Sequence, residues 1–444
     1  MDVRGLLRRT AMNCPAVLAV TVPGATALRL EAEAELRRRG WPLVAAPAAA
    51  DLLLVCGVPD RTAAAWVDGI ERSVPEPAVR IAVERGGQVA HALDVARREL
   101  TGRAVNARQA GAAHPPVHHR EATDRPDAPR SGQAGHGSAQ HPPTERPGKR
   151  QGHGAHGSGH GHHPHHDGSP PEESHGHAMG EVGGLPMAGR ADDRDALKLD
   201  RLHVPFGPGL SDWPTGLILR LTLQGDVVQG VEVDHLPVPS GHGPPFWDEP
   251  WLRAAGGEHV TRGSAARRRC AAHLDSAGRL LAVTGWDDAA ARCRLLRDGV
   301  LSGASREAMG GVLRGTVRRI GRSRTLRWSI AGLGRLPAGE ARAAGVSGPA
   351  LAADGDAHDR LLTWLRETER GLDALDDMRP LTSVDRTGPR GRLDGPKPPS
   401  QALLDVLPAL LTGAEYACAR IILASLDPDV DALAPAPVSG AVHG

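Results

Sequence analysis

Cysteine is scarce in this chain of 444 residues, and the few cysteines lie far apart. The five are Cys14, Cys56, Cys270, Cys293 and Cys418, and no two have Cys-x-x-Cys spacing. Such scattered positions fit neither a disulfide framework nor a zinc ribbon. Cysteines without a pairing pattern are typical of a reducing compartment. We therefore expect a cytoplasmic protein.

Aromatic side chains and long apolar runs are also lacking. Aromatic residues make up only 2% of the chain, yet hydrophobic residues make up 40%, so cores of Leu, Val, Ile and Ala are possible. No apolar stretch approaches the roughly 18 residues of a membrane span, so we expect no transmembrane segment. Arg4, Arg8 and Arg9 precede an apolar run at 16–20, as in a secretory signal. The same run is better explained as a first buried strand.

An excess of charge of one sign is absent as well. The chain carries 53 basic and 52 acidic residues, which gives a net charge of +1. A protein dedicated to nucleic acid usually carries a basic excess. The composition therefore predicts no nucleic-acid partner.

Residues 1–103 have the pattern of an α/β domain. Short apolar runs that predict buried strands alternate with segments of helical spacing. Thr26 and Asp60 are suited to cap two of the helices, and Gly40 is suited to end the first. We predict a small, open, doubly wound (flavodoxin-like) parallel sheet of about four strands. Its strands are expected at 16–22, 43–46, 52–56 and 79–83, and its helices at 26–40, 60–73 and 91–100.

Residues 104–190 lack any apolar pattern and are rich in Pro, Gly, Ser and His. Such a composition cannot bury enough surface to fold, which predicts a disordered linker. Fourteen of the 22 histidines of the chain lie between His114 and His177. Clustered imidazoles are good ligands for nickel and zinc. The candidate metal ligands are His153, His156, His160, His162, His163, His165 and His166.

Residues 191–444 predict a second domain, a β-hairpin followed by a mainly helical bundle. The hairpin at 217–234 places Leu217, Leu219, Leu221 and Leu223 on one buried face. Loops rich in Pro and Gly are expected at 336–350 and 388–399. Helices are expected at 263–283, 287–300, 305–330, 356–375 with Asp356 as N-cap, and 401–425 with a kink at Pro408.

The first domain resembles the small, cluster-bearing subunit shared by NADH–quinone oxidoreductase (respiratory complex I) and nickel–iron hydrogenases. The resemblance lies in the strand ADLLLVCG at 50–57 and in the segment VPEPAVRIA at 74–82. It covers about 70 residues, and the spacing between the two segments matches that family.

The second domain is similar to the large partner subunit of the same complexes. The segments FGP at 206–208, WPTG at 213–216 and LILRL at 217–221 resemble that family's opening hairpin, and GVSGPA at 345–350 resembles a later segment. The two resemblances occur in one chain, in an order that suggests a fusion of small and large subunits.

The chain departs from that family at the positions that carry redox chemistry. The family's small subunit holds a [4Fe–4S] cluster on four cysteines, because thiolates are the ligands of such clusters. Here VPGAT at 22–26 and ERGG at 84–87 stand where the family has cysteines, and both CxxC pairs of the hydrogenase large subunit are missing. In the hairpin motif, Trp213 and Thr215 replace histidines of the quinone-reducing relatives. A [4Fe–4S] cluster is therefore not expected.

Two further groups of residues have a simple structural interpretation. Cys56 ends a predicted parallel strand, where such sheets place ligands, yet a buried structural cysteine is the simpler reading. Arg314, Arg318 and Arg322 recur every four residues. They predict a solvated helix face, with an anionic lipid or an acidic partner subunit as the alternatives.

Three functions remain open from the sequence, and the chain is not identified as an enzyme. The first, which we favour, is a degenerate, non-redox accessory protein with a scaffold or assembly role. The second is an active iron–sulfur electron-transfer subunit of an oxidoreductase. The third is a nickel- or zinc-handling protein that uses the histidine-rich linker. The resemblance implies partners among other subunits of a membrane-associated oxidoreductase complex, and hence a place at the inner face of the cell membrane. No catalytic residue is assigned.

Overall fold

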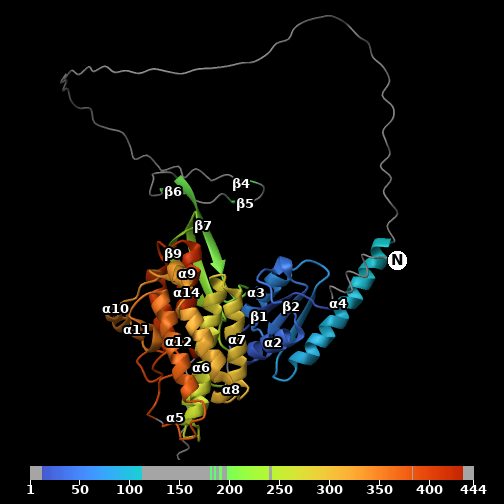
Figure 1. Ribbon diagram of the computed structural model, residues 1–444. Helices are drawn as coiled ribbons and strands as arrows, with labels where there is room; N and C mark the ends of the chain where they lie inside the picture. The colour runs from blue at the N-terminus through green and yellow to red at the C-terminus, as the bar shows by residue number, and fades with distance from the viewer. Residues whose placement is uncertain are drawn as a thin grey trace, which may run out of the picture. The chain divides into compact units, whose positions relative to one another are not determined.

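The computed structural model describes residues 13–112, 181–182, 185–186, 190–192, 198–239, 243–382 and 384–433 (Figure 1). The described residues of Met1–Ala113 and Met187–Gly444 belong to one compact unit. We call residues 13–112 the N-terminal part and residues 198–433 the C-terminal part. Most of the predicted linker lies outside the described residues. Within its range fall the end of helix α4 and the short antiparallel pair β4 (Glu181–Val182) and β5 (Leu185–Pro186).

A parallel sheet forms the centre of the N-terminal part. Its strands β1 (Val17–Thr21), β2 (Leu52–Cys56) and β3 (Val79–Val83) lie in the order β1-β2-β3, and every residue of β2 is buried. Leu43 forms a single parallel bridge to Val17 on the free edge of β1. With this bridge, β1 lies between the extended segment at Leu43 and β2, the next two extended segments of the chain. This is the doubly wound arrangement that the sequence predicts, with Leu43 as a bridge in place of a full strand.

The helices of the N-terminal part are α2 (Thr26–Arg39), α3 (Arg61–Glu71) and α4 (Val89–Ala112), with the short 3-10 turn η1 (Pro47–Ala49) before β2. Gly40 ends α2 in the left-handed conformation with φ 70°, and the Asp60 side chain caps α3, both as predicted. The prediction that Thr26 caps α2 is wrong, because Ala25 is the N-cap and the Thr26 hydroxyl bonds elsewhere. Helix α4 continues past the predicted end at residue 100 and runs to Ala112.

An antiparallel sheet opens the C-terminal part. It has the order β6 (Arg190–Asp192), β7 (Lys198–Phe206), β8 (Leu217–Gln224), β9 (Val227–His235). The predicted hairpin is β8–β9, and β7 is a partner strand that the sequence did not reveal. Leu217, Leu219, Leu221 and Leu223 share one buried core, as predicted, while Ile218 on the opposite face joins the core of the N-terminal part.

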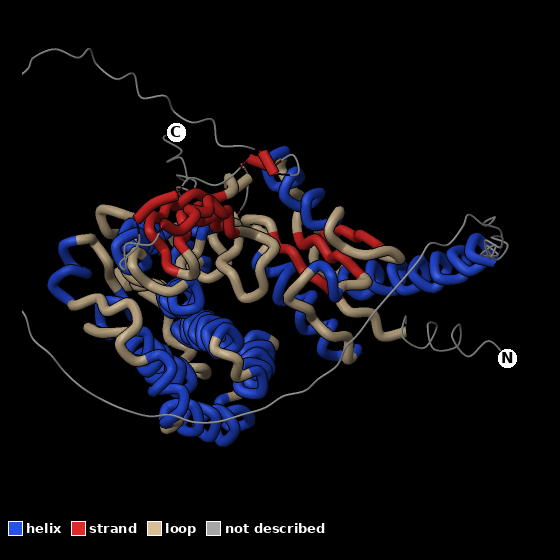
Figure 2. The backbone as a smooth tube through the Cα atoms, turned by 90° about the horizontal axis from the view of Figure 1, so that it is seen from above, coloured by secondary structure: helices blue, strands red, loops and turns tan. Residues whose placement is uncertain are grey.

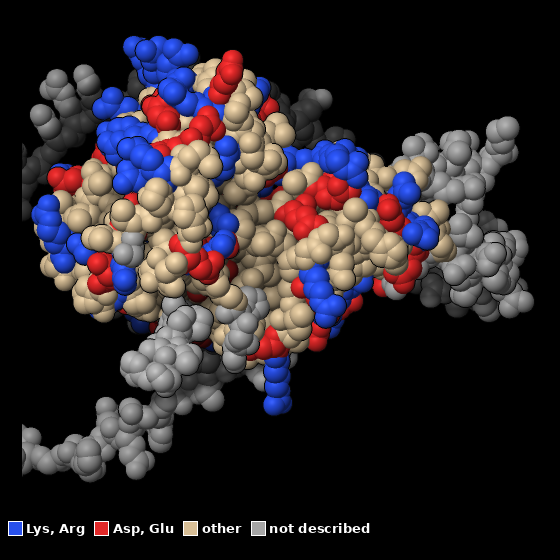
Figure 3. Space-filling model, turned by 90° about the horizontal axis from the view of Figure 1, so that it is seen from below, with Lys and Arg blue, Asp and Glu red and all other residues tan. Residues whose placement is uncertain are grey.

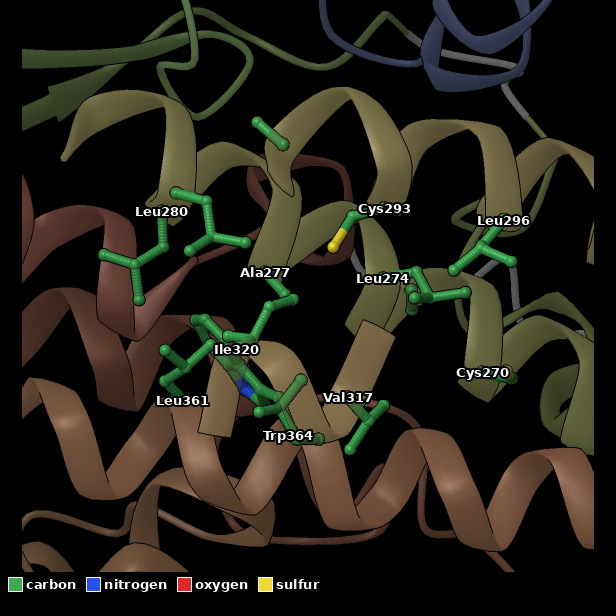
Figure 4. Packing of buried hydrophobic residues seen from close by; sticks show 14 of the residues in the cluster. Cys270, Leu274, Ala277, Leu280, Cys293, Leu296, Val317, Ile320, Leu361 and Trp364 are labelled. Atoms are coloured by element: carbon green, nitrogen blue, oxygen red, sulfur yellow. The ribbon is translucent and has the colours of Figure 1, made fainter. Parts of the chain in front are cut away.

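The helices of the C-terminal part pack around α6, which contacts α7 and α12 most extensively (Figures 1 and 2). Nearly all of α6 from Cys270 to Leu281 is buried, so this helix is enclosed on every side. Figure 4 shows side chains of α6, α7, α8 and α12 that converge in this core. The helices are α5 (Glu249–Ala255), α6 (Arg262–Val283), α7 (Asp287–Leu301), α8 (Arg306–Gly321), α9 (Arg324–Ile330), α10 (Ala338–Ala343), α11 (Gly348–Ala353), α12 (Ala357–Asp373), α13 (Pro399–Leu411) and α14 (Tyr416–Leu426), followed by the 3-10 turn η2 (Val430–Leu433).

Three predictions for this part are wrong in detail. The single helix expected at 305–330 is two helices, because Ser323 accepts a bond from the Leu326 N–H and starts α9. The last helix does not simply kink at Pro408. It ends at Leu411, where Thr412 is extended and Gly413 has φ 84°, and α14 begins afresh. The segment 336–350 holds α10 and the start of α11 as well as loop. Asp356 caps α12 as predicted, within a full capping box.

Leu361, Leu365 and Leu372 of α12 are buried and recur at helical spacing, so one face of this helix belongs to the core. Among the helices of the described residues, none has the length and apolar character needed to cross a membrane.

Candidate functional site

The carboxyl end of β1 is covered by the C-terminal segment of the same chain. After β1 the chain turns through Gly24, whose backbone N–H donates to Asp431 at 2.6 Å. The Thr26 hydroxyl donates to the second oxygen of the same carboxylate at 3.0 Å. Gly216, with φ 75°, lies so close to Pro23 that a Cβ would come within 2.6 Å of the ring. Ligands of doubly wound sheets bind at this edge, and here the edge is closed by protein.

A buried ionic network joins the two parts beside this contact. Asp275 of α6, 1% exposed, lies 2.8 Å from Arg29 of α2, 2.5 Å from Arg297 of α7 and 3.2 Å from Arg279. Glu33 of α2 lies 2.8 Å from Arg29 and 2.9 Å from Arg297. Three guanidinium groups thus surround two carboxylates that come from different parts of the chain.

These arginines govern the protonation of the buried carboxylates. Burial by itself would raise the pKa of Asp275, but Arg29, Arg279 and Arg297 hold it well below its usual value. Burial also opposes ionisation of Glu33, yet Arg297 and Arg29 lower its pKa to about 2. Both carboxylates are therefore charged at neutral pH, and the network is a set of true ion pairs.

Arg279 connects this network to a second buried group around Asp427. Asp427, with φ 47°, lies 2.8 Å from Arg279 and 2.6 Å from Arg390, and it accepts a hydrogen bond from Ser276 at 2.6 Å. A different balance holds at Asp248 nearby, where burial outweighs the effect of Arg390 and Arg268. Burial and the neighbouring Asp429 raise the pKa of Asp248 to about 7.

Asp431 shares this property. Burial and Asp429 raise its pKa to about 7, although the bonds from Gly24 and Thr26 act in the opposite direction. The contact that closes the end of β1 therefore contains a carboxyl group that titrates near neutral pH.

A cavity of about 660 Å³ lies beside the ionic network, between the two parts. Its wall on the N-terminal part is formed by β1, α2 and residues 41–45, and its opposite wall by the loop 208–215 and residues of α6, α7 and α14. Asp212 in that loop has φ 56°, and its carboxylate pairs with Arg294 of α7. Burial raises the pKa of Asp212 despite that arginine. A left-handed backbone at a cavity wall often marks a functional position.

Sequence reasoning missed this site because the network residues of α2 are more than 240 positions away from those of α6 and α7. Arg29 and Asp275, for example, are brought together only by the packing of α2 on the helices of the C-terminal part. One local signal was present. Asp275 and Arg279 are charged residues four apart in a helical segment that is otherwise small and apolar, and charges in a fully buried helix require partners.

The cysteines do not gather at this site. Cys56, at the end of β2, is fully buried, and burial with the nearby Glu33 raises the pKa of its thiol to about 12. Cys270 and Cys293 lie in the helical core, where Figure 4 shows them on different helices. Cys418 is partly buried, whereas Cys14 is exposed and donates to the Gly40 carbonyl. The complete burial of Cys56 agrees with its interpretation as a structural cysteine.

The predicted metal ligands fall in a different part of the chain. His153, His156, His160, His162, His163, His165 and His166 all lie outside the described residues. Within the described residues, no three His, Cys, Asp or Glu side chains are grouped so that they could hold a metal ion.

The arginines predicted on one helix face lie mostly at the surface. Arg314 of α8 pairs with Asp373 at 2.7 Å, while Arg318 and Arg322 are exposed. Trp328 of α9, which follows shortly after them, is 86% exposed. Elsewhere, basic and acidic side chains are interspersed on the face shown in Figure 3, in line with the low net charge.

No family model matches the chain, and no curated protein matches it. Among solved structures, a chain of the membrane-bound sulfane sulfur reductase, an archaeal respiratory membrane complex, is similar at 16% identity and a TM-score of 0.37. The match covers 52% of this chain and 98% of that one.

Proposed function

We propose that this chain is a non-redox accessory protein with a scaffold or assembly role. In this proposal, parts that resemble the small and large subunits of NADH–quinone oxidoreductase and nickel–iron hydrogenases are held together within one chain. Its partners would be other subunits of a membrane-associated oxidoreductase complex. The proposal rests on the sequence resemblance and on the geometry at the end of β1.

The observation that carries the proposal is the contact between Asp431 and the turn after β1. In the family that the N-terminal part resembles, cysteines in this turn hold the cluster. Here the turn contains no thiol, and Gly24 and Thr26 donate their hydrogen bonds to Asp431. Cys56 is the nearest cysteine in the sheet, and a buried thiol with a pKa of about 12 is a poor source of thiolate. The residues present therefore do not fit a cluster that requires four thiolates.

The ionic network supports the scaffold role. Arg297 is fully buried and bridges Glu33 of the N-terminal part to Asp275 of the C-terminal part. A buried charge that loses its partner is strongly destabilising, so the two parts depend on each other. Such mutual dependence suits a protein that presents a fixed surface to partner subunits.

The deciding experiment measures iron and acid-labile sulfide in protein purified without oxygen and without a metal-affinity column. The proposal expects neither element and no visible absorption. About four irons per chain would overturn it in favour of an active electron-transfer subunit. Deletion of the gene provides the second test, since loss of a scaffold or assembly protein should lower the amount of the assembled oxidoreductase complex. An unchanged amount of complex would contradict the role.

Metal handling is a second candidate, favoured by the histidine-rich sequence alone. Clustered imidazoles bind Ni²⁺ and Zn²⁺ at neutral pH. Calorimetric titration with NiCl₂ should give binding in the full chain and none after deletion of residues 114–177. Physiological metal handling further requires that nickel or zinc accompany the protein purified from its own cells, and metal-free protein would count against it.

A further inference from the structure

We infer that the cavity between the two parts is a binding site for a small organic anion with an apolar body. This inference goes beyond the scaffold role. It also does not depend on whether the chain carries a cluster, because the cavity residues are distinct from the turn after β1.

Several hydrogen-bonding groups in the cavity wall have no partner. Nine buried side-chain nitrogen and oxygen atoms of the described residues have no hydrogen-bond partner, and five of them belong to residues that line this cavity. Four of these five are donors, namely the Nε atoms of Arg37, Arg279 and Arg420 and the hydroxyl of Ser211. The fifth, Oε2 of Glu33, lies 2.9 Å from Arg297. Buried donors normally have hydrogen-bond acceptors. A ligand that supplies an acceptor group would satisfy these donors.

The charges in the cavity wall are also unequal. The lining contains five arginines and three carboxylates. Four of the arginines have carboxylate partners, since Arg29 and Arg279 bind Asp275, Arg37 binds Asp298 and Arg294 binds Asp212. Arg420 of α14 is the exception, because no carboxylate among the described residues pairs with it. A guanidinium group with an open partner position in a cavity favours a carboxylate, sulfonate or phosphate group.

Apolar side chains cover much of the cavity wall on the N-terminal part, beside Arg29, Glu33 and Arg37. Leu18, Leu36, Trp41 and Val44 line it, and Trp41 is only 6% exposed. Leu43, also in the lining, is 41% exposed, so the cavity opens to solvent beside it. A bare inorganic anion would leave this apolar surface and most of the 660 Å³ unfilled. Cavities of this size typically hold small molecules with an apolar body and a few placed polar groups.

The test compares two fluorescent probes that differ in charge. 8-Anilinonaphthalene-1-sulfonate carries a sulfonate, and N-phenyl-1-naphthylamine has the same aromatic body without it. We expect the wild-type chain to bind the sulfonate at least about tenfold more tightly. The variant Arg420→Gln should lose this preference, while Arg420→Lys should keep part of it. Decanoate should displace the sulfonate probe, and decanol should not.

Controls separate a specific site from general exposure of apolar surface. Arg327→Gln, at an exposed arginine outside the cavity lining, should bind both probes as the wild type does. Ala282→Trp, which adds a ring within the cavity, should weaken both probes. Near-ultraviolet circular dichroism establishes that each variant is folded. Equal affinity for the two probes in the wild type, or an unchanged preference in folded Arg420→Gln, would overturn the inference.

Discussion

Arg297 shows most clearly how single residues hold the two parts together. Its side chain is fully buried and contacts Asp275, Glu33 and Asp298. The variant Arg297→Met should destabilise the protein by about 3–5 kcal/mol, because it leaves buried carboxylates with too few partners. Urea denaturation followed by circular dichroism measures this change. The matched control is Arg38→Met, whose side chain is 68% exposed in its pair with Glu35 and which should leave the midpoint unchanged. Similar midpoints for the two variants would contradict the assigned role of the network.

Two buried carboxyl groups give the protein a characteristic dependence on pH. Asp248 and Asp431 have pKa values of about 7, and both titrate near 4 in an unfolded chain. Between about pH 4 and 7 the folded protein therefore binds more protons than the unfolded one. Its free energy of unfolding should fall as the pH rises through this interval. The lowered pKa values of Glu33 and Asp275 act in a separate window below about pH 4.

The variant Asp431→Asn isolates one of these groups. It removes the titration but keeps an oxygen that can accept from Gly24. From pH 5 to 7, the loss of stability should be about 2 kcal/mol smaller in this variant than in the wild type. Thermal denaturation in a series of buffers measures the slope. A variant with the wild-type slope would show that Asp431 does not titrate in this range.

Elements were predictable where their signals are local. The caps at Asp60 and Asp356 and the stop at Gly40 mark helix ends in the sequence itself, and the structure confirms all three. Thr26 failed as a cap because Asp431, 405 positions away, takes its hydroxyl. A contact of that kind leaves no local pattern. The strand β7 was missed although Leu202, Val204 and Phe206 alternate along it, because Pro205 interrupts the pattern.

Close packing of α12 on α6 depends on a glycine. A Cβ at Gly371 would lie 2.9 Å from the Cβ of Cys270 and 3.2 Å from the carbonyl oxygen of Ala266. Gly371→Ala should therefore force the helices apart and cost about 1–3 kcal/mol. Gly315 in α8 is the matched control, because nothing lies within 4 Å of its Cβ position. Gly315→Ala should stabilise by about 0.5–1 kcal/mol through helix propensity. Chemical denaturation measures the change in the free energy of unfolding, which should have opposite signs in the two variants. Stabilisation of both variants would contradict the close packing at Gly371.

The exposed surface of α8 and α9 has the residue types of a site for anionic lipid, one of the alternatives that the sequence left open for these arginines. Arg318, Arg322, Arg324 and Arg327 are exposed, and no carboxylate of the described residues is paired with them. Trp328 lies among them at 86% exposure. Arginine and tryptophan together favour the interface of an anionic bilayer. The protein should sediment with vesicles of phosphatidylglycerol but not of phosphatidylcholine, and the triple variant R322Q/R327Q/W328A should stay in solution. If the protein sediments equally with both lipids, or with neither, the prediction of lipid binding is wrong and these arginines form a solvated helix face.

At the scale of the whole molecule, the site could not be read from the sequence because it belongs to neither part alone. The order of strands and helices follows from local patterns, and so does the division into an α/β part and a helical part. The cavity arises only when α2 docks on α7 and the loop 208–215 closes beside it. The charged residues Arg29, Glu33 and Arg37 of α2 have the spacing of surface pairs, so their sequence alone does not distinguish a buried network from a solvated helix face.

The two parts also share apolar cores, which makes their association independent of the connection between them. Leu30 of α2 joins the helical core, and Ile218 and Leu236 join the core of the parallel sheet. A specific protease site inserted between residues 140 and 150 should therefore yield two fragments that elute together in size-exclusion chromatography. In the Arg297→Met background the fragments should separate more readily, because Glu33 and Asp275 lose the arginine that bridges them. The apolar contacts remain, so the separation should be partial. Fragments of the wild-type chain that separate at once at micromolar concentration would show that the connecting segment, and not the interface, holds the parts together. That result would remove the basis for a cavity built from both.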